Sequence, residues 1–261
     1  MDRVTTSLNR GAERTFTPHL VSRPAIVLAP HPDDAAFSVG GLLHRRIFPS
    51  VTIVTVFGKT NFLGAHGFQA RWQEVTAIRR AEDEAFAAEV DANLISCERP
   101  EAALRLRPSI DAIFGAVEAF PAELPNVLAD ILHRVKPGVI LAPAALGGHV
   151  DHRVVRALAP DLARSCGAAL AYYEDLPYAG WMAPGDIPKH VAAIRADLEP
   201  LTIRLNAVLP AKLSSMLLYR TQVTPDMVAT IRAYALLLDP TIGAERLWIL
   251  DGLGSGPGSS V

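Results

Sequence analysis

The stretch Ala25-Ile-Val-Leu-Ala-Pro-His31-Pro-Asp33-Asp34 is the segment of this 261-residue chain that decides the fold. Its apolar start shows no alternation with polar residues, which is typical of a strand buried on both faces. A second apolar run, 139–143, leads in the same way into Gly147-Gly-His149-Val-Asp151-His152. Ligands of open parallel sheets bind beyond the carboxyl ends of the strands. We therefore predict that these histidines and aspartates meet at one edge of an α/β sheet.

Such a cluster can hold a metal ion. His nitrogen and Asp oxygen are ordinary zinc ligands, and catalytic zinc typically keeps three protein ligands and an open position. His31, Asp34 and His152 supply that set, so we expect one zinc ion per chain, although another divalent metal would suit the same donors. The alternative is a turn in which Asp34 caps the next helix and His31 is a core histidine. Such a turn needs no second polar cluster at a matching position, and we favour the metal site.

Strands and helices alternate along the rest of the chain. A helix-length crossover at 35–46 joins the first strand to a second apolar run at 51–57, which makes a right-handed βαβ unit. Further strands are expected at 94–97, 139–143, 170–175, 201–205 and 245–250, and further helices at 69–90, 124–135, 152–163, 211–220 and 225–237. This order predicts a three-layer, Rossmann-like, mostly parallel sheet with helices on both faces.

The ends of the chain differ from its middle in composition. We expect a single domain over 24–250 and a flexible, glycine-rich tail at 251–261. The polar N-terminal arm, 1–23, is expected to pack on the domain or on a second copy of the chain in a homo-oligomer.

Several motifs carry a family resemblance. They are HPDD at 31–34, Gly40-Gly41, HVDH at 149–152, Arg79-x-x-Glu82, and the later Lys212, Tyr219 and Gln222. With them the chain resembles the PIG-L/LmbE family of zinc-dependent N-deacetylases over roughly 24–250. The resemblance implies an LmbE-like fold and removal of an acyl group, most often acetyl, from a glucosamine-type sugar in a glycosylated small molecule. It also implies that Arg79 contacts a substrate hydroxyl.

Amide hydrolysis at neutral pH needs an activated water, a stabilised oxyanion and a proton for the leaving amine. Zinc lowers the pKa of bound water toward about 7 and polarises the carbonyl group. Two adjacent carboxylates do not easily point the same way, so Asp34 can bind the metal while Asp33 contacts the water. We assign Asp33 as the general base, in line with the family, and expect it to pass the proton to the amine.

The second motif supplies the remaining catalytic groups. His149 and His152 are three residues apart and would share one face of a helical turn. A protonated His149 is then expected to donate to the carbonyl oxygen while His152 binds the metal. Asp151 would hold one of the two imidazoles in its working tautomer, and the sequence leaves open which one.

Two loops are predicted to line the substrate pocket. The glycine-rich loop after the second strand, which contains Asn61 and His66, would form one wall. The loop around Tyr178 offers an aromatic platform for a sugar ring, or else packs at the sheet edge. The helix at 69–90 is expected to leave most of its charges in solvent and to bury an apolar stripe of Ile78, Ala81, Ala85 and Ala88. A surface position for Arg79 therefore competes with its substrate role.

The chain departs from the family pattern at two positions. Ala35 stands where many members have Glu after the Asp pair, which puts support of the ligands in doubt. Gly147 stands where many have a Tyr that polarises the carbonyl group. Tyr178 or Tyr219 would have to substitute for it, or His149 would act alone.

Charge and composition narrow the class of function. Lys and Arg number 25 against 27 Asp and Glu, and no basic stripe is present, which argues against a nucleic-acid partner. Cys97 and Cys166 are too few for a disulfide framework and fit a reducing cytoplasm. Neither a signal peptide nor an apolar run of about 18 residues occurs, so we expect a cytoplasmic protein without a membrane span.

The prediction is thus a zinc-dependent N-deacetylase acting on an amino-sugar conjugate. Two alternatives stay open: a zinc-dependent hydratase or lyase of a small carboxylic acid, which extra Arg or Lys in the pocket would favour, and a catalytically silent, sugar-binding member.

Overall fold

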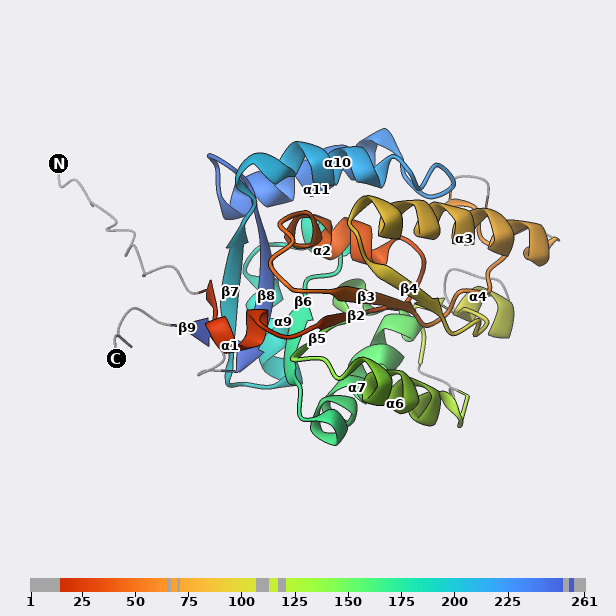
Figure 1. Cartoon of the computed structure of the whole chain (residues 1–261). Helices are drawn as coiled ribbons and strands as arrows, with labels where there is room; N and C mark the ends of the chain where they lie inside the picture. Colours follow the sequence, from red (N-terminus) through yellow and green to blue (C-terminus); the bar gives the residue numbers. More distant parts are fainter. Residues whose placement is uncertain are drawn as a thin grey trace.

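A mixed sheet forms the centre of the protein. The computed structural model describes residues 15–64, 67–69, 71–106, 113–116, 121–250 and 254–255. Within them, seven strands pair in the order β4-β3-β2-β5-β6-β8-β7 (Figure 1). They are β2 (Ala25–Ala29), β3 (Val51–Thr55), β4 (Asn93–Ser96), β5 (Val139–Pro143), β6 (Ala169–Tyr173), β7 (Leu198–Arg204) and β8 (Ala244–Leu250).

The topology creates a crevice between β2 and β5. The strands β4, β3, β2, β5 and β6 run parallel, and β8 is antiparallel to both β6 and β7. From β2 the chain proceeds outward through β3 to β4, and then returns to β5 on the other side of β2. A reversal of this kind opens a crevice at the carboxyl ends of the two central strands. The two polar motifs of the sequence follow these two strands.

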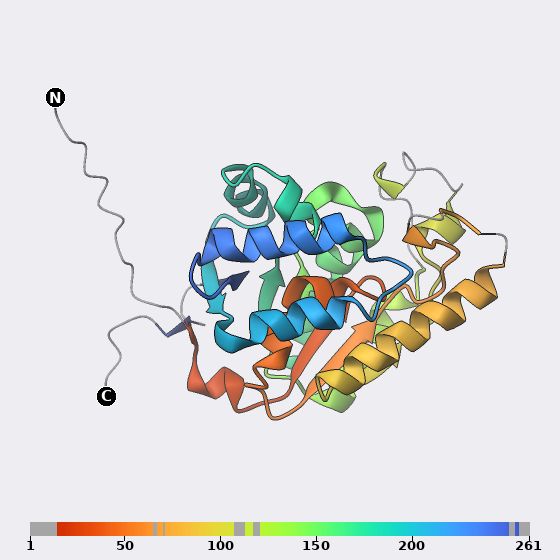
Figure 2. The ribbon, with the colours of Figure 1, turned by 90° about the horizontal axis from the view of Figure 1, so that it is seen from above.

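Helices cover both faces, which confirms the predicted three-layer fold (Figures 1 and 2). One face carries α2 (Asp34–His44), α3 (Trp72–Glu89), α10 (Leu209–Met216) and α11 (Pro225–Leu238), and the other carries α6 (Leu124–Val135) and α7 (Val150–Cys166). In β2, Val27 packs into the core with Phe37 of α2, whereas Ile26 and Leu28 pack with Leu128 of α6. The strand is apolar at every position because it faces helices on both sides.

The shorter elements escaped the sequence analysis. They are α1 (Pro18–Val21), α4 (Ala102–Arg105), α8 (Tyr178–Trp181), α9 (Asp186–Ile194), the 3-10 turns η2 (Leu146–Gly148) and η3 (Asn206–Val208), and the paired strands β1 (Thr15–Phe16) and β9 (Gly254–Ser255). Phe16 and Leu20 belong to the main core cluster, so this end of the arm packs on the domain.

A buried ion pair fixes α2 in place. The Glu245 carboxylate on β8 accepts hydrogen bonds from the backbone N–H groups of Gly41 and Leu42, both at 2.8 Å. Lys212 of α10 donates to the same carboxylate at 2.6 Å and is fully buried. A Cβ atom at position 41 would lie 2.5 Å from Leu205 and 2.9 Å from Glu245. Glycine is therefore required for this close approach.

Candidate active site

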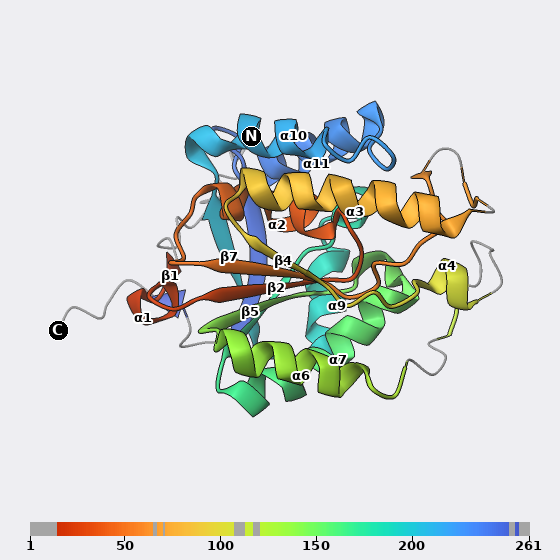
Figure 3. The ribbon, with the colours of Figure 1, turned by 45° about the vertical axis from the view of Figure 1, so that its right-hand side comes forward.

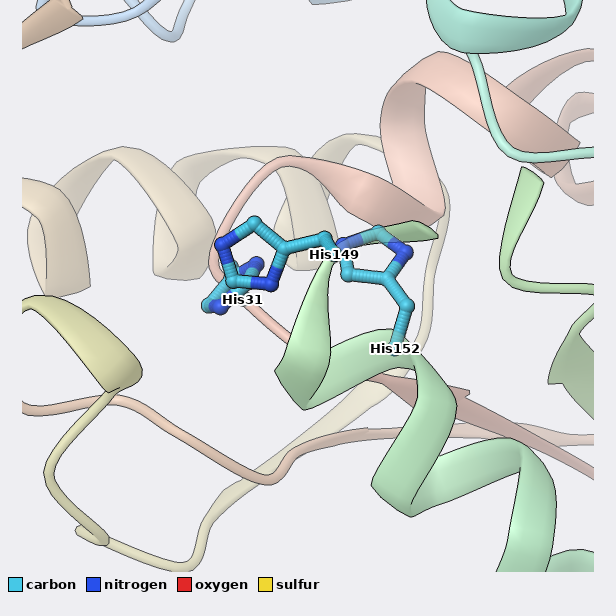
Figure 4. Close-up of side chains that lie close together, drawn as sticks. All are labelled: His31, His149 and His152. Atoms are coloured by element: carbon cyan, nitrogen blue, oxygen red, sulfur yellow. The ribbon is translucent and has the colours of Figure 1, made fainter. Parts of the chain in front are cut away.

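Histidines from the two motifs converge in the crevice between β2 and β5. His31 lies in the loop after β2, and His149 and His152 lie at the start of α7, with their rings gathered together (Figure 4). One ligand atom from each of the three lies within 4.8 Å of the others. Asp34, the first residue of α2, joins them from the β2 side.

The distances among the predicted ligands match a tetrahedral ion. Asp34 Oδ2 lies 3.4 Å from His31 Nδ1 and 3.4 Å from His152 Nε2. Ligands placed 2.0–2.1 Å from a tetrahedral zinc ion are roughly 3.4 Å apart. All three residues are buried. His149 is close enough to His31 and His152 to be considered as a ligand as well, and the assignment of the ligand set stays a prediction.

Carboxylates orient both imidazoles of the predicted set. His31 Nε2 pairs with Asp151 Oδ2 at 2.9 Å, which leaves Nδ1 facing Asp34. His152 Nδ1 pairs with Asp175 Oδ1 at 2.6 Å, which leaves Nε2 facing Asp34. A carboxylate behind a histidine in this way fixes the tautomer that presents a lone pair to a metal. The prediction that the Asp151 side chain holds His149 or His152 is therefore wrong, because this carboxylate contacts His31 instead.

The sequence analysis missed Asp175. It follows β6 and also accepts a hydrogen bond from the backbone N–H of Leu146 at 2.9 Å. The signal was present in the sequence, because the run 170–175 also ends in polar residues at the carboxyl end of a strand.

The carboxylates of the cluster favour a positive charge beside them. Burial opposes protonation of His31, but its hydrogen bonds with Asp151 and Asp34 outweigh burial and raise its pKa to about 10. A donor set this rich in carboxylates suits a cation in the space that its lone pairs face.

Asp33 stands beside the ligands in a strained conformation. Its φ angle is +120°, a region that residues other than glycine rarely adopt. Arg79 Nη2 donates to Asp33 Oδ2 at 2.9 Å and to the carbonyl oxygen of Pro32 at 2.7 Å. Burial raises the pKa of Asp33 to about 7, although the charge of Arg79 opposes the rise. A carboxyl group with this pKa can take up and release a proton near neutral pH.

The predicted buried face of α3 is wrong, and so is the surface position considered for Arg79. Arg79 is only 2% exposed, and the buried face of the helix comprises Val75, Arg79, Glu82, Asp83, Phe86 and Ala87. The stripe expected to be buried, which includes Ile78 at 48% exposure, faces solvent instead. Each buried charge has a partner that the sequence could not reveal: Asp33 for Arg79, Thr221 for Glu82, and both Thr55 and Tyr219 for Asp83.

His149 is held as a neutral imidazole. Its Nδ1 accepts a hydrogen bond from the backbone N–H of Asp151 at 3.2 Å, which makes it the N-cap of α7. Burial and the neighbouring His31 and His152 lower its pKa to about 2. Because Nδ1 is an acceptor, the proton of the neutral ring lies on Nε2, where it can still be donated. The protonated His149 of the sequence analysis is therefore not the form that this environment favours.

Tyr178 fills the space beside Gly147. A Cβ atom at Gly147, which has a φ of +80°, would lie 2.5 Å from Cδ1 of the Tyr178 ring. The ring stands edge-on to His152 at 5.9 Å, and burial raises the pKa of its hydroxyl. Tyr219 is fully buried and donates to Asp83 at 2.9 Å, so its hydroxyl is already engaged. Of the two tyrosines considered from the sequence, only Tyr178 lines the pocket.

The pocket above the cluster has an aromatic wall. Its volume is about 400 Å³. Besides the His and Asp residues it is lined by Phe37, Phe62, Phe68, Phe114, Tyr178, Trp181 and Met227, among others. Phe62, Gly64 and Phe68 confirm that the loop after β3 forms one wall. Arg79 is the only Arg or Lys among the described lining residues, and it is already paired with Asp33 and, at 3.6 Å, with Glu101.

Asn61 and His66 were also predicted to contact the substrate. The Oδ1 atom of Asn61 is buried without a hydrogen-bond partner, but Asn61 is not among the residues that line the pocket. His66 lies outside the described residues. Ala35, the other departure from the family pattern, is buried in α2.

Several deacetylases and a hydratase are among the known proteins that this chain is similar to in sequence or fold. A 2'-N-acetylparomamine deacetylase of Streptomyces fradiae is 28% identical over 257 residues, which covers 94% of this chain and 88% of that enzyme. The solved structure of an A40926 pseudoaglycone deacetylase has a TM-score of 0.68 at 21% identity, over 92% of this chain and 100% of that one. A 4-carboxy-2-hydroxymuconate hydratase of Pseudomonas putida KT2440 has a TM-score of 0.60 at 16% identity, over 92% and 98%. The two structural likenesses establish a shared fold only.

The described part of the chain contains no helix long and apolar enough to span a membrane. A family model described as PIG-L, GlcNAc-PI de-N-acetylase, matches residues 26–163. Because this match covers more than half of the chain, the protein belongs to the PIG-L family.

Proposed function

We propose that the protein is a zinc-dependent hydrolase that removes an N-acyl group, most often acetyl, from a glucosamine-type sugar of a glycosylated small molecule. The observation that carries the proposal is the cluster beside Asp33 in which Asp34 Oδ2 lies 3.4 Å from a ring nitrogen of both His31 and His152. The deacetylase relative that covers 94% of the chain supports it. The two free cysteines support action in the cytoplasm.

His31 Nδ1, His152 Nε2 and Asp34 Oδ2 are the proposed ligands. We prefer Asp34 to His149 as the third ligand because its distances fit the tetrahedral edge and because His149 Nδ1 is already an acceptor. When bound, zinc supplies Lewis acidity that activates water and polarises a carbonyl group.

The remaining steps belong to side chains of the protein. Asp33, held by Arg79, accepts a proton from the attacking water and delivers it to the leaving amine. His149 Nε2–H and the Tyr178 hydroxyl donate to the carbonyl oxygen as negative charge develops on it. Arg79 therefore acts by holding Asp33 rather than by contacting a substrate hydroxyl. The rings of Phe114, Tyr178 and Trp181 offer apolar surface to the C–H faces of a sugar.

A deacetylation assay tests the proposal. Zinc-loaded protein is incubated with a panel of N-acetylglucosaminyl compounds, and free amine is measured. We expect amine from at least one compound and a fall in kcat of about 100-fold or more in Asp33→Asn, with Asp130→Asn on the exposed side of α6 as control. Equal rates in Asp33→Asn would show that Asp33 is not the base. Absence of amine from every compound with metal-replete protein would refute the proposed function.

The pocket argues against the hydratase alternative. A small carboxylic acid bound at the metal cluster needs a cationic partner there, and the only Arg or Lys among the described residues that line this catalytic pocket is occupied by Asp33 and Glu101. Arg153 and Arg156 line a separate, neighbouring pocket. The likeness to a hydratase structure does not alter this, because fold alone does not determine reaction. A catalytically silent member has no support from Gly147, since Tyr178 occupies the space beside it.

A further inference from the structure

A second pocket, rich in cations, lies behind the loop that carries His149. It has a volume of about 350 Å³ and is lined by Arg153 and Arg156 of α7 and by His190 of α9, together with Phe114, Ala145, Gly148, Ala193 and Ile194. Arg153 and Arg156 follow His149 and His152 by four residues each, so they lie one helical turn further along α7. The helices α7 and α9 are visible together in Figure 3.

Neither guanidinium group has an acidic partner among the residues that the structure describes. Arg153 Nη1 donates to the carbonyl oxygen of Gly115 at 2.8 Å, and Arg156 Nη1 makes only a 3.4 Å contact with that of Ala144. No carboxylate of the described residues lies within 4.0 Å of either group. Arg164, on the same helix, is by contrast paired with Asp161. Since each guanidinium carries five N–H donors, most donors in the pocket remain free for a ligand.

His190 adds a third donor to the same pocket. Its Nε2 lies 3.1 Å from the carbonyl oxygen of Ala144 and 3.5 Å from Arg156 Nη1. A carbonyl oxygen can only accept, so Nε2 carries a proton and cannot accept from Arg156. The contact with Arg156 therefore does not satisfy the guanidinium.

Placing the guanidinium groups of Arg153 and Arg156 side by side is energetically unfavourable. Both arginines are half-buried, and burial together with the charge of Arg153 lowers the pKa of Arg156, although the more distant charge of Asp175 opposes the fall. Like charges that are partly desolvated and lack a directly paired carboxylate do not stabilise a fold. Planar guanidinium groups at such a site suit the oxygens of a carboxylate or phosphate.

The cationic pocket adjoins the catalytic one. Phe114 lines both, and its ring stands edge-on to His149 at 5.6 Å and to Tyr178 at 6.2 Å. Gly148, on the wall of the cationic pocket, directly precedes His149. A substrate in the catalytic pocket therefore has the cationic pocket next to it, across the shared Phe114 wall.

We propose that Arg153, Arg156 and His190 bind an oxyanion, a carboxylate or a phosphate, carried by the same substrate whose N-acyl group is cleaved. The substrate is then an N-acylated amino sugar with an acidic substituent. This inference rests on the proposed function, so one arm of its test is independent of catalysis.

The first arm measures binding of inorganic phosphate to zinc-loaded protein by thermal unfolding at constant ionic strength. Phosphate at ten times its Kd should raise the Tm of the wild type and of the control Arg164→Gln by about 3 °C. The double variant Arg153→Gln/Arg156→Gln should lose this shift, and Arg153→Lys/Arg156→Lys, which keeps the charges, should retain part of it. An equal shift in the Gln double variant means that phosphate binds elsewhere, at the metal for example, and overturns the proposal. Circular dichroism verifies that all variants fold.

The second arm compares kcat/KM for N-acetylglucosamine 1-phosphate, N-acetylmuramic acid and the neutral methyl N-acetylglucosaminide. The wild type should prefer one acidic compound, and which one it prefers separates phosphate from carboxylate. The ratio of acidic to neutral kcat/KM should fall about tenfold or more in the Gln double variant. An unchanged ratio contradicts the proposal. If no compound is hydrolysed, the proposed function fails, whereas the phosphate arm still decides whether the pocket binds an anion.

Discussion

At the scale of single residues, the ring of His152 is aimed by a carboxylate outside both sequence motifs. Asp175 Oδ1 lies 2.6 Å from His152 Nδ1, and both side chains are buried. Asp175→Asn keeps the shape but places a neutral amide behind the imidazole. We expect zinc affinity to fall 10- to 100-fold, on the order seen when the carboxylate behind a ligating histidine is lost. Competition with a chromogenic chelator measures the affinity, and Asp197→Asn, an exposed position, is the control.

Alanine substitutions at the neighbouring Gly147 and Gly148 separate the effect of backbone strain from that of steric crowding. Their φ angles are +80° and +82°, so alanine at either should cost about 1–2 kcal/mol of stability through backbone strain. A Cβ at Gly147 would also collide with the Tyr178 ring, whereas a Cβ at Gly148 meets nothing within 4 Å. We therefore expect Gly147→Ala to lower kcat strongly and Gly148→Ala to lower it little.

A double-mutant cycle with Tyr178→Phe completes this test. If Gly147→Ala acts by displacing the Tyr178 hydroxyl, the loss of kcat in the double variant should be close to that of Tyr178→Phe alone. Losses that simply multiply would mean that the two residues act independently, and the donor role of Tyr178 would then be wrong.

Residue identities at strand ends could be predicted, but their partners could not. The sequence placed His31, Asp33, Asp34, His149 and His152 at one site because parallel strands end at one edge of a sheet. It predicted His149 or His152 as the partner of Asp151, and it could not show that this carboxylate contacts His31, which is 120 residues away in the sequence. That choice depends on how α7 enters the crevice.

At the scale of secondary-structure elements, α2 is held by a charge pair that no local pattern reveals. Glu245 accepts two backbone N–H groups of α2 and pairs with Lys212, and both side chains are buried. Glu245→Ala would leave the Lys212 ammonium buried and unpaired, so we expect a loss of about 3–5 kcal/mol in the free energy of unfolding. Adding Lys212→Met to this variant removes the orphaned charge and should recover part of the loss. Urea denaturation measures both values, and an additive double variant would contradict the coupling.

Long-range polar pairing also explains why the wrong face of α3 was predicted to be buried. A helix normally buries its apolar stripe, and the pattern of the sequence favoured Ile78 and three alanines. The buried face instead carries Arg79, Glu82 and Asp83, because the crevice and the segment around Thr221 offer each of them a partner. Asp33 is 46 residues from Arg79 in the sequence, and Thr221 and Tyr219 are more than 130 residues from Glu82 and Asp83. Hydrophobic periodicity does not register such polar pairing.

At the scale of the whole molecule, the site joins the two halves of the sheet. His31 and Asp34 follow β2, whereas His152 belongs to α7, which follows β5. A bound ion would therefore cross-link segments more than 100 residues apart, and its binding free energy would add to the stability of the folded state. The protein should consequently be more stable with zinc than after treatment with a chelator.

The stabilisation that zinc provides can also show whether Asp34 or His149 is the third ligand. Zinc at about 100 times its Kd should raise the Tm of chelator-treated wild type by roughly 5–10 °C. His149→Asn keeps an N-cap acceptor for the Asp151 N–H, and its zinc-dependent shift should remain. Asp34→Asn keeps an oxygen for the His31 N–H but loses the anionic ligand, and its shift should largely disappear. The opposite result, a shift that survives in Asp34→Asn and is lost in His149→Asn, would identify the three histidines as the ligands and would free Asp34 for a role in proton transfer.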